Sequence, residues 1–186
     1  FAMWGNNSGD SDLRARLIES VNASDALFAV VNGDLTSLGT RLQLRAAALE
    51  LDALTIPWFA TPGDKDADSD LDAAIVESLG ATTFAFDVGS VRLMIADSGD
   101  SALTERSHDL ISTWLDGTPL WWPTRAAPPT RLLITHVPPF DPFGALRRKA
   151  EIHLIFPQDA FAVQQIDLAR ALIDHNAGHL WPVIGL

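Results

Sequence analysis

The feature that most constrains the fold is an arrangement that occurs three times along the chain. A short apolar run leads into a residue whose side chain is a common metal ligand. The run Ala26–Val31 leads into Asp34, a second run leads into Asp64, and a third leads into His136. Apolar runs of this length are typical of strands covered on both faces. Because open α/β sheets carry ligand sites at the carboxyl ends of their strands, we expect these three side chains to meet at one edge.

The spacing of apolar residues predicts alternating strands and helices in the first part of the chain. Ser11 is a plausible N-cap for the first helix. Strand–helix–strand units of this kind join parallel strands through right-handed crossovers. The expected strands are 1–5, 26–31 and 56–60, and the expected helices are 11–22, 40–54 and 70–79.

The pattern changes after residue 80. Gly89-Ser90 is a two-residue turn between two apolar runs, which predicts a β-hairpin. A hairpin is unexpected in a simple doubly wound sheet and indicates a second, partly antiparallel sheet. The expected elements here are strands at 82–88, 91–97, 131–136 and 180–186, and helices at 103–115 and 160–175.

Composition excludes several classes of partner and site. The 186 residues carry 13 basic and 24 acidic side chains, a net charge of -11, which argues against binding a nucleic-acid backbone. There is no cysteine, so thiolate metal sites and disulfides are absent. No apolar run approaches the ~20 residues that a membrane-spanning helix needs. The length suits one domain with a sizeable core.

The order of motifs resembles the calcineurin-like metallophosphoesterase family. The Gly-Asp motif of that family is present at Asp34, and its histidine motif is present as His136 followed by Val-Pro-Pro. The segment around Trp114 resembles the family's Trp-Leu helix. The resemblance implies an α/β fold, a four-layer α/β/β/α sandwich with mixed sheets, as a single domain over 1–186. It also implies metal ions held at the strand ends.

Several positions differ from the family's pattern. Asn6 and Ser8 stand where the family has Asp and His, and its Gly-Asn-His-Asp/Glu motif reads Gly-Asp64-Lys65-Asp66. The metal ligands that the resemblance implies are Asn6, Asp34, Asp64 and His136. By the same resemblance Lys65 and Asp66 are the catalytic candidates, with Lys65 offering positive charge to a phosphoryl oxygen in place of the family's histidine.

The family's last motif, Gly-His-x-His, is absent in its usual form. Gly178-His179 keeps one histidine, but the apolar run 183–186 is the better match to the strand that precedes this motif. His179 is therefore interpreted as a surface-loop residue. In the family further strands follow this point, so we expect a truncated sheet with an exposed edge that a partner protein could cover.

Counting ligands favours one ion over two, because two neighbouring cations need several anionic or imidazole groups. The resemblance implies one or two divalent ions, Mn, Mg, Fe or Zn, and the oxygen-rich set suits Mn²⁺, Mg²⁺ or Ca²⁺ better than zinc. If Lys65 neutralises the two aspartates instead, no metal ion is bound.

The resulting hypothesis is a metal-dependent phosphoesterase-type hydrolase, a phosphatase acting on a small phosphate ester. The alternative is a catalytically inactive pseudoenzyme that serves as a binding or scaffold module. A doubly wound phosphatase with an Asp nucleophile would need Asp where the chain has Asn6.

Overall fold

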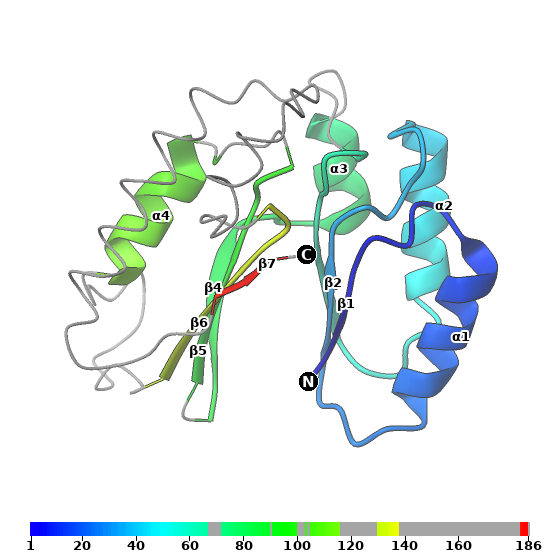
Figure 1. Cartoon of the computed structure of the whole chain (residues 1–186), viewed down its shortest axis with the longest axis horizontal. Helices are drawn as coiled ribbons and strands as arrows, with labels where there is room; N and C mark the ends of the chain where they lie inside the picture. Colours follow the sequence, from blue (N-terminus) through cyan, green and yellow to red (C-terminus); the bar gives the residue numbers. More distant parts are fainter. Residues whose placement is uncertain are drawn as a thin grey trace, which may run out of the picture.

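The computed structural model describes residues 1–66, 72–89, 91–99, 103, 105–115, 130–137 and 183–185. Within these residues two β-sheets lie face to face, and helices cover both outer sides (Figure 1). Strand–helix alternation in the first part and the expected hairpin in the second are both confirmed. The α/β fold class is therefore confirmed, with one parallel and one mixed sheet.

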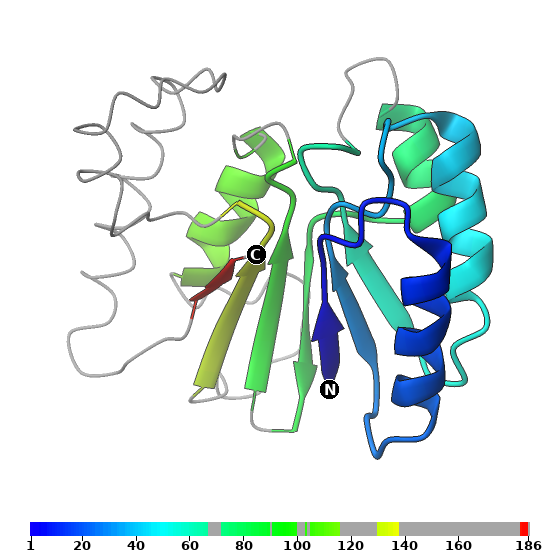
Figure 2. The ribbon, with the colours of Figure 1, turned by 45° about the vertical axis from the view of Figure 1, so that its right-hand side comes forward.

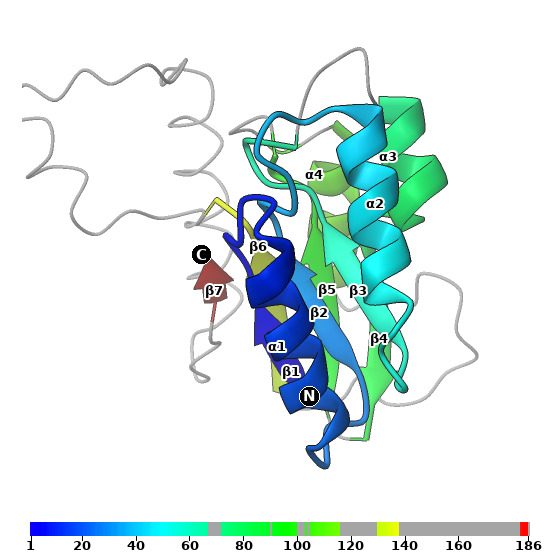
Figure 3. The ribbon, with the colours of Figure 1, turned by 90° about the vertical axis from the view of Figure 1, so that its right-hand side faces the viewer.

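The first sheet is parallel and has the strand order β1-β2-β3. Its three helices lie on the same outer face, which is turned toward the viewer in Figure 3. One-sided cover places the other face of the sheet against the second sheet. The strands are β1 (Ala2–Trp4), β2 (Ala29–Asn32) and β3 (Trp58–Thr61), and the helices are α1 (Ser11–Asn22), α2 (Arg41–Leu51) and α3 (Asp72–Leu79).

The N-cap of the first helix lies one residue earlier than expected. Asp10 is the N-cap of α1, and its carboxylate accepts a 2.8 Å hydrogen bond from the Leu13 backbone N–H. The expectation for Ser11 was therefore wrong. Ser11 is the first helical residue, and its hydroxyl donates to Glu50 of α2 instead. Aspartate and serine are about equally good caps, so the sequence could not choose between adjacent candidates.

The second sheet is mixed and has the order β4-β5-β6-β7 (Figure 2). An antiparallel hairpin joins β4 to β5, whereas β5 pairs with β6, and β6 with β7, in parallel. A helix, α4, packs against the outer face of this sheet. The elements are β4 (Phe84–Val88), β5 (Val91–Ala96), α4 (Glu105–Leu115), β6 (Thr130–Thr135) and β7 (Val183–Gly185).

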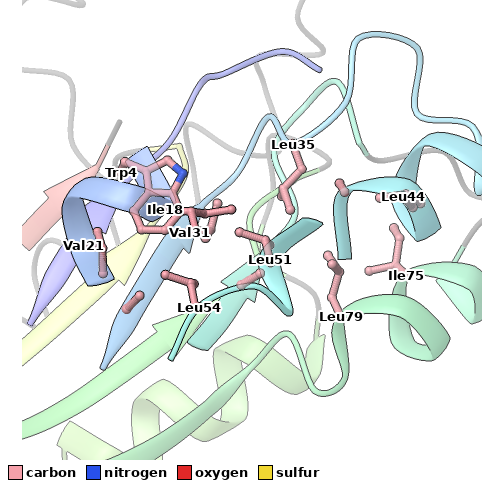
Figure 4. Close-up of a cluster of buried hydrophobic side chains, with 13 residues drawn as sticks. Trp4, Ile18, Val21, Val31, Leu35, Leu44, Leu51, Leu54, Ile75 and Leu79 are labelled. Atoms are coloured by element: carbon pink, nitrogen blue, oxygen red, sulfur yellow. The ribbon is translucent and has the colours of Figure 1, made fainter. Parts of the chain in front are cut away.

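Three apolar layers hold the sheets and helices together. Under α1, α2 and α3 lies a cluster that includes Leu35, Leu44 and Leu51, each fully buried (Figure 4). Trp114 of α4 packs in a second cluster on the outer face of the mixed sheet. Between the sheets lies a third cluster of aliphatic and aromatic side chains, in which the ring centroids of Phe59 and Phe86 lie 4.8 Å apart. This ordering of helices, sheet, sheet and helix matches the expected layers.

Some expectations fall on parts of the chain that the structure does not describe. The helix expected at 160–175 and the loop histidine His179 lie outside the described residues. The expectations of a single domain over 1–186 and of an exposed edge beyond β7 remain predictions. Among the described helices, none combines the length and apolar character that a bilayer crossing requires.

Candidate metal centre

Asp34, Asp64 and His136 converge at the carboxyl-terminal ends of three strands. Asp34 follows β2, Asp64 follows β3, and His136 follows β6 of the facing sheet. One potential ligand atom from each of the three lies within 4.8 Å of the others. Asp34 and His136 are buried, whereas Asp64 faces solvent. The expected meeting of these three residues at one edge is therefore confirmed.

The imidazole of His136 is oriented by the backbone of β2. Its Nδ1 lies 2.9 Å from the carbonyl oxygen of Asn32, and a carbonyl oxygen only accepts, so Nδ1 carries the proton. Its Nε2 then faces Asp64 Oδ1 at 3.2 Å and Asp34 Oδ1 at 3.5 Å. A neutral imidazole would thus direct a lone pair toward two carboxylate oxygens. The contacts are favourable either with a second proton on Nε2, which then donates to the carboxylates, or with a cation among the three atoms.

Two glycines allow this close approach. A Cβ on Gly33 would lie 2.2 Å from His136 Nδ1, and one on Gly63 would lie 2.3 Å from the Asp34 backbone nitrogen. Gly33 also has a φ of +78°, a conformation that glycine adopts without steric cost. The loop after β2 can therefore approach His136 only because residue 33 is glycine. The loop after β3 can approach Asp34 only because residue 63 is glycine.

Three residues of the site adopt left-handed backbone conformations. Asn6, Ser8 and Asp34 have φ values of 55°, 46° and 55°. Two backbone hydrogen bonds hold them in place, from Asn6 N–H to Gly33 O at 3.0 Å and from Ser8 N–H to Asp34 O at 2.7 Å. Residues held in this region cost about 1–3 kcal/mol each, and such strain clusters at functional sites. Here it turns the Asn6, Ser8 and Asp34 side chains toward one another.

Lys65 lies in the middle of that group. Its ammonium Nζ is 2.6 Å from Asp34 Oδ2, 2.9 Å from Ser8 Oγ and 3.3 Å from Asn6 Oδ1. The hydrogen bond to Asp34 raises the pKa of Lys65 above its ordinary value, so the side chain is charged at neutral pH. The Lys65 side chain is 42% exposed, so it lies partly open to solvent.

Asp66 lies beneath the two loops and is fully buried. Its carboxylate accepts from the backbone N–H groups of Leu35, Thr36 and Gly63 at 2.8–3.0 Å, and from the Thr36 hydroxyl. These bonds tie the loop after β2 to the loop after β3. They fit a positioning role, while the catalytic role expected for Asp66 stays a prediction.

Two residues that support the site were not recognised from the sequence. Asn32 acts through its carbonyl oxygen on His136, and a backbone contact leaves no signal in the sequence. Arg14 is 3% exposed, pairs with Glu50 and donates a 2.6 Å hydrogen bond to the carbonyl oxygen of Leu35. Its position on the apolar face of α1 was an available signal, because a lone arginine on a buried helix face must have partners.

The donor set fits one divalent cation. Two carboxylates and one imidazole are ligands for Mn²⁺, Mg²⁺ or Zn²⁺. The Nδ1–H bond of His136 to a backbone carbonyl is the usual outer-shell partner of a metal-bound histidine. Asn6 lies on the other side of Asp34, beside Lys65, so its expected contribution to the same ion stays a prediction.

A solved structure shares the fold of this chain. The chain is similar to purple acid phosphatase PPD1 from yellow lupin (Lupinus luteus) seeds, a calcineurin-like metallophosphoesterase, with a TM-score of 0.57 and 12% sequence identity. The match covers 87% of this chain and 34% of that one, so the chain spans about a third of that protein's length. No family model matches the sequence, and no curated protein matches it either. The resemblance to metallophosphoesterases is thus confirmed at the level of the fold.

Proposed function

We propose that the chain is a metal-dependent hydrolase of phosphate esters whose cation is held by Asp34, Asp64 and His136. The observation that carries this proposal is the convergence of three potential ligand atoms, one from each of these residues, within 4.8 Å of one another. When bound there, a divalent cation supplies an activated water and polarises a phosphoryl oxygen. The fold shared with a phosphatase supports phosphate esters as the substrate class.

The residues around the cation position have distinct tasks in this proposal. Lys65 has a partly exposed side chain, and the positive charge of its ammonium can offset the negative charge of a phosphoryl group. The Ser8 hydroxyl, 2.9 Å from that ammonium, fixes its direction. His136 is kept in one tautomer by the Asn32 carbonyl, and Asp66 keeps the two Gly-Asp loops in register.

The test is metal-dependent hydrolysis with a matched control. Purified protein is depleted of metal, supplied with Mn²⁺, and assayed with bis(p-nitrophenyl) phosphate and p-nitrophenyl phosphate. We expect turnover that needs Mn²⁺ and that Asp34→Asn abolishes. Asp25→Asn also removes one carboxylate, but from the exposed loop before β2, at the opposite edge, and should keep full activity. Equal turnover of both variants would refute the assignment.

A second function is favoured by one specific observation. The Lys65–Asp34 ion pair already offsets part of the negative charge of the site without any metal. A domain that binds an anionic partner at Lys65, with no hydrolysis, would use the same arrangement. Binding of inorganic phosphate that Lys65→Met removes, together with no turnover at any Mn²⁺ concentration, would favour this binding domain over the hydrolase.

A further inference from the structure

The two carboxylate oxygens of Asp34 face two different cation positions. Oδ1 lies 3.5 Å from His136 Nε2, on the side of the group formed with Asp64. Oδ2 lies 2.6 Å from Lys65 Nζ, on the side of Asn6 and Ser8. Asp34 is 2% exposed, so the carboxylate has little freedom to turn. It therefore bridges two neighbouring positions that both favour positive charge.

The second position is already filled by a covalently attached cation. An ammonium has three N–H donors. Each finds an acceptor here, in Asp34 Oδ2, Ser8 Oγ and Asn6 Oδ1, at 2.6, 2.9 and 3.3 Å. All three acceptors belong to residues with left-handed backbone conformations, and backbone strain of this kind clusters at functional sites. The ammonium is thus held like a bound ion in a cage of three oxygens.

The remaining donors at this position are poor for a divalent ion. Asn6 and Ser8 are uncharged, so Asp34 Oδ2 is the only anionic oxygen among the three acceptors that Lys65 contacts. A divalent ion there would also have to displace the ammonium and lie close to a second ion at Asp64 and His136. The mutual repulsion of two such ions is offset only by several anionic ligands.

We propose that the Lys65 ammonium is a built-in replacement for a second metal ion, so that the site takes up one divalent cation and not two. This inference rests on the metal position of the proposed function and refines it. The positive charge that would otherwise come from a dissociable ion is part of the chain. One consequence is that the charge beside Asp34 is present at any metal concentration.

The experiment measures metal stoichiometry and affinity, which do not depend on turnover. Metal-free wild type is titrated with Mn²⁺ by calorimetry, and bound ions are counted by elemental analysis. Electron paramagnetic resonance then separates isolated Mn²⁺ from an exchange-coupled pair. We expect one ion per chain and the spectrum of an isolated ion.

Variants of Lys65 test the role of its charge. Lys65→Met removes the repulsion between the ammonium and the ion, so Mn²⁺ should bind about tenfold more tightly. Lys65→Arg keeps the charge and should bind Mn²⁺ like wild type. The double variant Asn6→Asp/Lys65→Met replaces the fixed cation with an anionic ligand, and should take up two ions with a coupled spectrum. Lys65→Gln substitutes for Lys65→Met if the latter does not fold.

Each result decides between the two proposals. Two ions in wild type, or equal Mn²⁺ affinity of wild type and folded Lys65→Met, would overturn the inference and leave the hydrolase proposal standing. A folded Asn6→Asp/Lys65→Met variant that still binds a single ion would also overturn the inference and leave the hydrolase proposal standing. One ion in wild type with no turnover would support the inference and refute the hydrolase. No bound ion at all would overturn both.

Discussion

Gly63 leaves no room for a methyl group beside Asp34. A Cβ at this position would lie 2.3 Å from the Asp34 backbone nitrogen and 2.4 Å from Asp34 Oδ1. Non-bonded heavy atoms settle at about 3.5 Å, so in Gly63→Ala the Asp34 loop must retreat by about 1 Å. Overpacking of this kind costs about 1–3 kcal/mol, which lowers Tm by about 5 °C in a chain of this size.

The same displacement should weaken metal binding. Metal–ligand distances tolerate deviations of only about 0.2 Å, so Asp34 would no longer contact an ion shared with Asp64 and His136. Disturbing the support of metal ligands typically lowers affinity by about 10–100-fold. We therefore expect Gly63→Ala to bind Mn²⁺ at least tenfold more weakly in a calorimetric titration.

Gly80→Ala is the matched control for this experiment. Gly80 has a φ of +80°, so alanine there is strained, but its Cβ would meet nothing within 4 Å. Left-handed alanine costs about 1–2 kcal/mol, so both variants should lose stability. Only Gly63→Ala should lose metal affinity. If the two variants bind Mn²⁺ equally well, the close fit of the Gly-Asp loops does not position Asp34 for a metal.

Three further outcomes are expected. Asp66→Asn places an amide N–H₂ against backbone N–H donors and should destabilise the fold by about 3 kcal/mol in a denaturant titration. A loss below about 1 kcal/mol would contradict the positioning role of Asp66. Mn²⁺ should raise the Tm of wild type but not of His136→Gln, and an equal rise in both would remove His136 from the site. Phe59→Ala opens the apolar layer between the sheets and should cost about 3 kcal/mol, whereas an unchanged Tm would show that this layer does not hold the sheets together.

Much of the fold could be predicted because the periodicity of apolar residues and the turn at Gly89 are local signals. The order of strands and helices and the hairpin between β4 and β5 came from these patterns alone. Element ends were less accurate. The apolar run predicted a strand at 26–31, whereas β2 is Ala29–Asn32. Strand ends depend on the partner, here the pairing of Ala29 with Trp58 and of Asn32 with Thr61, which the sequence of one strand does not show.

The candidate site was predictable where side chains follow strands and unpredictable where backbone geometry decides. Asp34, Asp64 and His136 were expected at one edge because parallel strands end together. The three acceptors around Lys65 depend on the left-handed backbone of Asn6, Ser8 and Asp34. Asn and Asp are enriched in that conformation, but most of them do not adopt it, so residue type alone does not predict it. The contacts of Asp66 with the loop after β2 are likewise tertiary.

The most direct test is an anomalous difference map from crystals of the protein grown with Mn²⁺. We expect one peak per chain, bounded by Asp34 Oδ1, Asp64 and His136 Nε2, with Lys65 Nζ still bonded to Asp34 Oδ2. No peak among those three side chains, with Mn²⁺ in excess, would contradict the metal site, and a second peak at the Lys65 position would contradict the single-ion arrangement.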